Sequence, residues 1–313
     1  MQIAVFLSAA LAGLNNRPIL GILTQPEDNS TKTYIAASYV EFLESAGARV
    51  VPVHYDASPA ELKALFRSIN GLLLPGGGAN LSNGTLIHSA GRLLYDLAVT
   101  ANDAGDSFPI WGTCMGFQFL SLLTARDDSV LCQHCYDTEG VALPLDFVEP
   151  AATNSRLYGH LPTSLKQSLA TNGLTLNAHH DGLAPSSFTT NQRLAAGFDV
   201  LSTNKDGHGR PFVSSIEAKH YPFAGTPLCH GRGRSRLTAW QPLPPPCCLD
   251  TPPSEASALS VAQLEASPLA GTQWHPEKNN FEWREGIGIP HTADAVAVSQ
   301  YVANFIVSNA RRR

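Results

Sequence analysis

The feature that most constrains the fold is a repeated alternation of apolar, strand-like runs with stretches of helical periodicity. Ile19 to Leu23 is an apolar run typical of a buried strand, and a polar loop from Gln25 to Thr33 follows it. Tyr34 to Ala46 then has apolar residues at helical spacing and stops at Gly47, a residue that commonly ends helices. Such alternation is typical of βαβ units. We therefore predict an α/β fold, with a mostly parallel central sheet and helices on both faces.

The same alternation continues along the chain as far as Leu123. Between Leu131 and Glu217 the segments are shorter and more strand-like, and an amphipathic helix from Ala293 to Ala310 closes the chain. The further strands expected are Arg49–Val53, Leu72–Leu74 and Phe108–Trp111, and the further helices are Pro59–Ile69, Ser89–Ala104 and Gly116–Leu123.

Composition excludes several classes of protein. With 43% hydrophobic and 15% charged residues, the chain can bury a sizeable core and is not disordered as a whole. The 21 basic and 26 acidic residues form no long run of either sign, so nucleic acid is not an expected partner. No apolar run reaches the roughly 18 residues that a membrane span needs, so we expect no membrane association in the mature form.

The N-terminus favours secretory targeting. Ile3 to Leu14 is apolar or small and contains Ala10-Leu11-Ala12, a pattern that signal peptidase accepts. We predict a signal peptide and leader over residues 1–16, followed by a single domain over 17–313. Because Met1-Gln2 lacks positive charge, a buried first strand or helix is the alternative. The expected location is the secretory pathway, with a vacuole, a lysosome or the extracellular space as destination. Three glycosylation sequons add weak support, at Asn29, Asn80 and Asn83.

One internal segment, Thr226 to Gly271, does not fit the alternating pattern. It holds eight of the 22 prolines and three of the six cysteines, and its composition is typical of a disordered loop. The triplet Ala-Gly-Thr occurs at both of its ends, at 224–226 and at 270–272. We interpret the segment as an insert, with a retained intron as its source, whose removal would join Gly225 to Thr272.

A nucleophile is predicted where a strand meets a helix. Gly112-Thr113-Cys114-Met115-Gly116 follows an apolar strand and opens a helix, which is the cysteine counterpart of the nucleophile elbow. The glycines permit the sharp turn, and the unpaired N–H groups of the helix N-terminus stabilise a thiolate over a thiol. A small buried core residue is the alternative, but it would not require both glycines. We predict that Cys114 is nucleophilic.

The acid/base partner is predicted in Gln273-Trp274-His275-Pro276-Glu277. A thiolate nucleophile needs an imidazole to move protons, and the imidazole needs an acceptor that orients it. Residues two apart in an extended segment project to the same side, so Glu277 can accept the second N–H of His275. A surface histidine beside a solvated glutamate is the alternative for this motif taken alone.

Glycines also follow the third strand, in Pro75-Gly76-Gly77-Gly78. Backbone N–H groups of consecutive glycines can approach a ligand closely, so we predict an oxyanion hole made by Gly76, Gly77 and the N–H of Met115. A plain turn is the alternative. Two weaker signals, the Cys132 to Cys135 pair and His179-His180-Asp181, are not interpreted as metal sites, and no metal or other cofactor is expected.

These residues resemble a family, the class I glutamine amidotransferase-like hydrolases, and within it the γ-glutamyl hydrolases, also called folylpolyglutamate hydrolases. The likeness runs from Arg17 to Gly225 and resumes from Thr272 to Arg311. Its most specific motifs are Gly21–Leu23, Tyr34–Val40, Leu43–Val53, Ser68–Gly71, Trp111–Cys114 and Gln273–Lys278.

The resemblance implies site roles and a substrate class. It implies Cys114 as nucleophile, His275 as acid/base and Glu277 as its orienting group. It also implies substrate contacts from three further residues, Tyr34, Gln118 and His179. The implied substrates are small molecules, folate-like poly-γ-glutamates, cleaved through a thioester on the cysteine.

Alternatives to this function remain open. Gln118 follows the amidotransferase pattern, whereas γ-glutamyl hydrolases more often resemble Gly-x-Cys-x-Gly-Phe-Glu, so a free-standing glutaminase is the second hypothesis. A non-catalytic homologue is the third, because Thr226–Gly271 lies just before His275 and could displace it. The sequence does not decide between a monomer and a homodimer.

Overall fold

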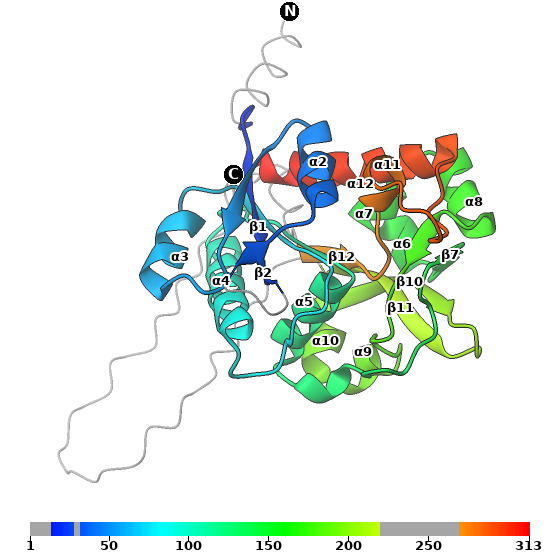
Figure 1. Cartoon of the computed structure of the whole chain (residues 1–313), viewed down its shortest axis with the longest axis horizontal. Coiled ribbons are helices and arrows are strands. Elements are labelled where there is room, and N and C mark those ends of the chain that lie inside the picture. The colour runs from blue at the N-terminus through cyan, green and yellow to red at the C-terminus, as the bar shows by residue number, and fades with distance from the viewer. Residues whose placement is uncertain (1–13, 28–31, 220–268) are drawn as a thin grey trace, which may run out of the picture.

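The computed structural model describes residues 14–27, 32–219 and 269–313. Within them an eight-stranded sheet runs in the order β4-β1-β5-β6-β12-β11-β10-β8 (Figure 1). The first five strands run parallel to one another, and the pairs β12–β11, β11–β10 and β10–β8 are antiparallel. Their bounds, in chain order, are β1 Ile19–Leu23, β4 Arg49–Val53, β5 Gly71–Leu74, β6 Ile110–Thr113, β8 Asp146–Phe147, β10 Phe198–Lys205, β11 Pro211–Ala218 and β12 Leu269–Thr272.

Two small antiparallel pairs and a set of helices complete the described fold. The pairs join β2 (Gln25–Pro26) to β3 (Thr33–Tyr34) and β7 (Val141–Leu143) to β9 (Thr175–Asn177). The helices are α2 Ala37–Ser45, α3 Pro59–Phe66, α4 Leu86–Asp103, α5 Met115–Ala125, a 3-10 turn η1 Asp128–Val130, α6 Ala151–Asn154, α7 Arg156–Gly159, α8 Thr163–Thr171, α9 Ser187–Thr190, α10 Gln192–Gly197, α11 Lys278–Phe281 and α12 Ala293–Ala310.

The sheet separates two hydrophobic cores. Along β5, Leu72 and Leu74 belong to the core that includes residues of α3, α4 and α5, and Leu73 belongs to the core that includes residues of α2 and α12. Successive side chains of a strand point to opposite faces, so a strand covered on both sides must be apolar throughout. This explains why the parallel strands are continuous apolar runs, and it confirms the predicted α/β fold with helices on both faces (Figure 1).

Most predicted elements agree with the structure, but some differ. The helix expected over Tyr34–Ala46 spans Ala37–Ser45, and Tyr34 lies on β3 instead. The predictions for β1, β4 and α12 match the observed bounds. The segment from 131 to 217, expected to be mainly strand-like, contains five short helices, α6 to α10, as well as strands. These helices are only four to nine residues long, which leaves little helical periodicity to detect.

The C-terminal end of the predicted insert coincides with a strand of the sheet. Leu269, Ala270 and Gly271, expected to belong to the insert, form β12 with Thr272 in the centre of the sheet. A Cβ on Gly271 would lie 2.6 Å from the carbonyl oxygen of Gly112 on β6, so the strand requires glycine there. Two copies of Ala-Gly-Thr made the boundary ambiguous in sequence. The rest of the insert and the predicted signal peptide, apart from residues 14–16, lie outside the described residues.

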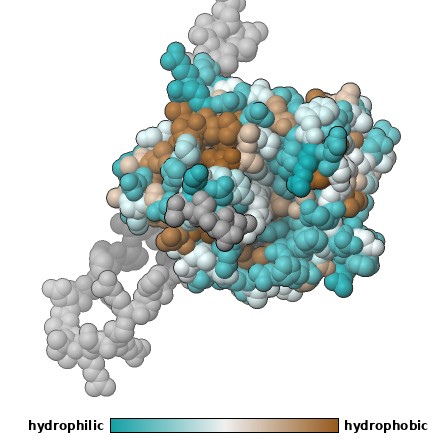
Figure 2. All heavy atoms as spheres, in the orientation of Figure 1, coloured by the Kyte–Doolittle hydropathy of each residue, from teal (hydrophilic) through white to brown (hydrophobic). Residues whose placement is uncertain are grey.

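Polar and apolar side chains are unevenly distributed over the surface of the described part of the chain. On the face shown in Figure 2, hydrophilic side chains predominate over the α9, α10 and β10 side, and apolar side chains gather nearer β1 and α2. Among the described helices, none combines the length and the apolar character that crossing a membrane would require.

Candidate active site

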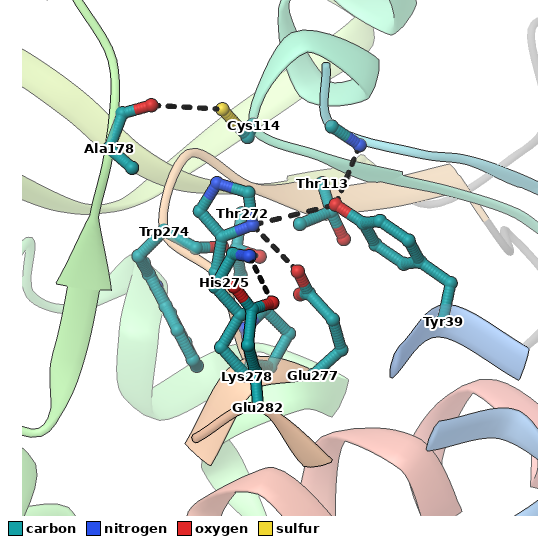
Figure 3. A network of polar contacts seen from close by, with 12 residues as sticks. Tyr39, Thr113, Cys114, Ala178, Thr272, Trp274, His275, Glu277, Lys278 and Glu282 are labelled. Carbon is teal, nitrogen blue, oxygen red and sulfur yellow. Dashed lines mark hydrogen bonds and ion pairs between the residues drawn. The ribbon is translucent and has the colours of Figure 1, made fainter. Parts of the chain in front are cut away.

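Cys114 occupies the sharp turn between β6 and α5. Its backbone has φ 52° and ψ −114°, a conformation that non-glycine residues rarely adopt, and it is the N-cap of α5. Strained backbone of this kind is concentrated at functional sites, and it is the geometry of a nucleophile elbow. The residue is 4% exposed, and its Sγ lies 3.9 Å from the carbonyl oxygen of Ala178 (Figure 3). The predicted elbow is therefore present.

The two glycines of the motif are required by close backbone packing. A Cβ on Gly112 would lie 2.5 Å from the carbonyl oxygen of Gly116, and a Cβ on Gly116 would lie 1.8 Å from that of Leu74 on β5. Contacts this short force the backbone to shift. The motif therefore keeps glycine on either side of the cysteine because strand, turn and helix pack too closely for any side chain.

His275 and Glu277 follow β12 and form a buried pair. The Nδ1 atom of His275 lies 2.7 Å from Oε1 of Glu277, and the two residues are 5% and 0% exposed. The second ring nitrogen of His275 points toward Cys114, so the imidazole lies beside the thiol (Figure 3). Cys114 is far from His275 and Glu277 in the sequence, and the fold brings the cysteine beside this pair.

The electrostatic environment favours the protonated imidazole. Burial lowers the pKa of His275, but the negative charge of Glu277, and after it that of Cys114, raise this pKa to about 10. A buried carboxylate without a counter-charge is costly, so an imidazolium beside Glu277 is the arrangement that balances it. The site is therefore suited to hold a thiolate and an imidazolium together.

Tyr39, on α2, is a site residue that sequence reasoning did not single out. Its hydroxyl accepts a hydrogen bond of 2.7 Å from the N–H of Gly76 and lies 3.4 Å from Nδ1 of His275 (Figure 3). Burial, followed by the negative charges of Glu277 and Cys114, raises the pKa of Tyr39 well above 10, so the hydroxyl stays neutral. In the sequence Tyr39 counted only as an apolar helix position. The need of a buried tyrosine hydroxyl for a partner was the available signal.

The glycine loop after β5 differs from prediction in one respect. The N–H of Gly76, predicted as an oxyanion donor, already donates to Tyr39, so this donor is occupied in the structure. A Cβ on Gly76 would lie 2.8 Å from Cε1 of His275 and 3.1 Å from Cβ of Cys114, so the glycine allows the loop to touch the site. Gly77 and Met115 line the same cavity as the cysteine.

A cavity of about 580 Å³ opens beside Cys114. Gln118 and His179, both predicted to contact substrate, line it. The Nε2 of Gln118 donates to the carbonyl oxygen of Asp181 at 2.8 Å and to Oε1 of Gln273 at 3.3 Å. These bonds fix the amide of Gln118 at the cavity wall.

His179 is a neutral hydrogen-bonding group. Burial lowers its pKa to about 3, despite a hydrogen bond to the carbonyl of Asp181. The Nδ1 atom lies 2.8 Å from that carbonyl oxygen and Nε2 lies 3.3 Å from Oδ1 of Asn177, so protein groups contact both ring nitrogens. His179 therefore cannot supply a positive charge to a substrate at ordinary pH.

The remaining predicted positions lie elsewhere or have other roles. Tyr34 is on β3 with 42% of its surface exposed, and it is not among the residues that line the cavity. Cys132 and Cys135 form a disulfide. Within the described ranges, no group of three or more His, Cys, Asp or Glu residues could hold a metal ion.

Comparison with known proteins identifies the family. The profile of the Peptidase C26 family matches residues 18–219. The chain is 39% identical to "Gamma-glutamyl hydrolase" of Mus musculus over 95% of its own length and 79% of the mouse protein, and 37% identical to the Homo sapiens protein of that name over 95% and 78%. It is 33% identical to "Gamma-glutamyl hydrolase B" of Dictyostelium discoideum over 96% and 74%. With its family profile and its relatives in agreement over most of the sequence, the chain belongs to the Peptidase C26 family.

Proposed function

We propose that this chain hydrolyses γ-glutamyl bonds in small molecules, with folylpoly-γ-glutamates as the substrate class. The names of its relatives support the bond type. One observation carries the mechanism: Cys114 sits in a strained elbow beside a buried imidazole and carboxylate pair held at 2.7 Å. A thiolate beside an imidazolium is the arrangement that acyl transfer from an amide requires.

The first half of the reaction forms a thioester. The Cys114 thiolate attacks the γ-carbonyl carbon, and the carbonyl electron pair moves to the oxygen, which the N–H groups of Gly77 and Met115 stabilise. When the tetrahedral intermediate collapses, the carbon–nitrogen bond breaks. His275 gives its proton to the departing amine and becomes neutral, and Glu277 keeps the ring oriented.

The second half returns the enzyme to its starting state. The neutral imidazole of His275 removes a proton from a water molecule, and the resulting hydroxide attacks the thioester carbonyl. The carbon–sulfur bond breaks, which releases the γ-glutamyl acid and restores the Cys114 thiolate beside a protonated His275. Tyr39 stays neutral throughout and holds the Gly76 N–H through its hydroxyl oxygen.

Location and assembly belong to the same proposal. A leader over residues 1–16 would direct the hydrolase domain to the secretory pathway, with a vacuole, a lysosome or the extracellular space as the destination. The domain itself spans 17–313 and is interrupted by the insert. A homodimer is the assembly to test against a monomer, by light scattering of the purified chain.

The assay that tests the function supplies two substrates to the purified chain. With pteroyl-tri-γ-glutamate we expect shortened pteroyl products by mass spectrometry, and with glutamine we expect little release of ammonia. Inactivity on the first substrate together with rapid glutamine hydrolysis would reject the proposal in favour of a glutaminase. Slow alkylation of Cys114 by iodoacetamide, at the rate of an ordinary thiol, would favour a non-catalytic homologue.

A further inference from the structure

The cavity is also lined by two histidines that the proposed mechanism does not use. His134 lies in the loop that follows η1, and His180 directly follows His179. Their side chains are 88% and 55% exposed, so both can be reached from solvent. This distinguishes them from His179, which is 5% exposed.

The charged side chains around the cavity are acidic, and this gives the two histidines a distinct role. Among the described residues that line it there is no lysine or arginine, whereas three carboxylates do line it, those of Asp128, Glu139 and Asp181. A γ-linked glutamate chain carries an α-carboxylate on every residue. The wall therefore has to accept a polyanion without any permanent positive charge.

Among the described residues that line the cavity, only imidazoles can supply cationic side-chain donors. Of the three histidines that line the cavity, His179 stays neutral because burial holds its pKa at about 3. That leaves His134 and His180 as the described lining side chains that can present a charged N–H to a carboxylate.

The ring nitrogens that face neighbouring acids remain accessible for a ligand, whereas Nδ1 of His180 lies 3.2 Å from the carbonyl oxygen of Tyr136. Nδ1 of His134 is 3.9 Å from Oδ1 of Asp181, and Nε2 of His180 is 3.9 Å from Oε2 of Glu139. Both distances exceed those of hydrogen bonds, so a substrate oxygen can take these donors. The neighbouring acids are close enough to repel a misplaced carboxylate.

The backbone holds the two histidines in a fixed relation. The segments that carry them pair through Cys132 and Gly182, whose N–H and C=O groups bond each other at 2.9 and 3.1 Å, and through a bond from Tyr136 N–H to the His180 carbonyl at 3.0 Å. The Cys132–Cys135 disulfide closes a short ring around His134. The backbone N–H of His134 also donates a hydrogen bond to Oδ1 of Asp181 at 2.7 Å.

We propose that His134 and His180 form a carboxylate-recognition site for the part of the γ-glutamyl chain that does not react. This inference rests on the proposed function and deepens it, because it names the residues that select a polyanionic chain over other γ-glutamyl amides. Both are specificity residues, and neither takes part in bond cleavage.

The test measures binding separately from turnover. Pteroyl-tri-γ-glutamate is titrated by calorimetry into the Cys114→Ala protein, at about pH 5.5, below the pKa of a free imidazole. Adding His134→Gln or His180→Gln should raise the Kd about threefold each, and both together about tenfold, as expected for exposed charge pairs. Exchanging His180 for lysine, which carries a permanent charge under these conditions, should preserve the parent's Kd.

A matched control and a second ligand make the result specific. His208→Gln should leave the Kd unchanged, because His208 is also exposed, lies 3.8 Å from the carboxylate of Asp137, and does not line the cavity. For γ-glutamyl-p-nitroanilide, whose leaving group is uncharged, the double variant of His134 and His180 should bind as the parent does.

The outcomes separate this inference from the function on which it rests. An unchanged Kd for the tri-γ-glutamate in the double variant, or an equal loss for both ligands, would overturn the recognition site. If the parent enzyme with Cys114 cleaves neither substrate while binding still depends on the two histidines, the hydrolase function fails and the recognition site stands.

Discussion

Replacing Glu277 by glutamine tests how the buried pair activates the site. The substitution keeps the shape of the side chain and removes its charge beside His275, whose Nδ1 lies 2.7 Å from the carboxylate. Burial lowers the pKa of His275, and Glu277 is the larger of the two charges that raise it to about 10 from 6.5. Without that charge, the pKa of His275 should fall markedly.

The size of the effect follows from the same pKa. A rise from 6.5 to about 10 corresponds to about 5 kcal/mol in favour of the imidazolium. If Glu277 supplies at least half of this, its neutralisation removes about 2.5 kcal/mol, which is about a 70-fold loss in kcat when the full amount falls on the chemical step. Because His275 would then lose its proton at lower pH, the alkaline limb of the pH–rate profile should move to lower pH.

The assay is steady-state hydrolysis of γ-glutamyl-p-nitroanilide across pH, with thermal unfolding to confirm the fold. Glu282→Gln is the matched control, because Glu282 pairs with Lys278 and does not contact His275. It should keep the parent's kcat and pH profile. A Glu277→Gln protein within about threefold of the parent's kcat, with the same alkaline limb, would refute the assigned role, since about 70-fold is expected.

Three further substitutions or deletions test other parts of the account. Gly76→Ala should lower kcat/KM about a hundredfold by displacing the triad, while Gly78→Ala, whose Cβ would meet nothing within 4 Å, should not; equal kinetics in the two would contradict the packing argument. His179 has a folded pKa of about 3 against an ordinary 6.5, so its contribution to stability is complete above pH 6.5 and is lost as pH falls toward 3. Urea unfolding of His179→Gln should lack this loss, about 1.4 kcal/mol per pH unit, and an unchanged slope would disprove the assignment. Deleting Thr226–Gly271 should give a chain at least as soluble and as active as the full protein, whereas deleting Gly225–Gly271, which puts alanine where β12 needs glycine, should impair both; the reverse order would reject the insert hypothesis.

The sequence predicted the elbow and the triad because their chemistry depends on residue type and local order. The glycines around Cys114 indicate a turn that excludes side chains. His275 and Glu277 pair at 2.7 Å as predicted, but across a turn instead of an extended segment, because Glu277 has helical backbone angles as the N-cap of α11. β1 is almost wholly buried and gives a continuous apolar run, whereas β4 is an edge strand that is only partly buried but still carries three valines in five residues. Patterns of this kind depend on residues that are close together in the sequence, so they can be detected without the fold.

Features that depend on tertiary contacts were not predictable in the same way. Tyr39 looks like any apolar position of α2, and only the fold shows its hydroxyl at the N–H of Gly76. That bond also occupies the N–H of Gly76, which the glycine motif predicted as a donor to the oxyanion. The N-terminal limit of β12 was hidden because Leu269–Gly271 resembles the earlier copy at 223–225, and only pairing with β6 and β11 distinguishes the strand.

The central claim is that Cys114 forms a thioester with the γ-carbonyl of its substrate, and acid-quench mass spectrometry tests it most directly. The protein is mixed with γ-glutamyl-p-nitroanilide, quenched during the first turnover, digested, and the peptide containing Cys114 is weighed. The account predicts a γ-glutamyl adduct on Cys114 that disappears on further incubation and is absent from a folded Cys114→Ala protein, which should also release no p-nitroaniline. Release of p-nitroaniline by the alanine variant near the parent's rate, or an adduct on another residue, would contradict the account.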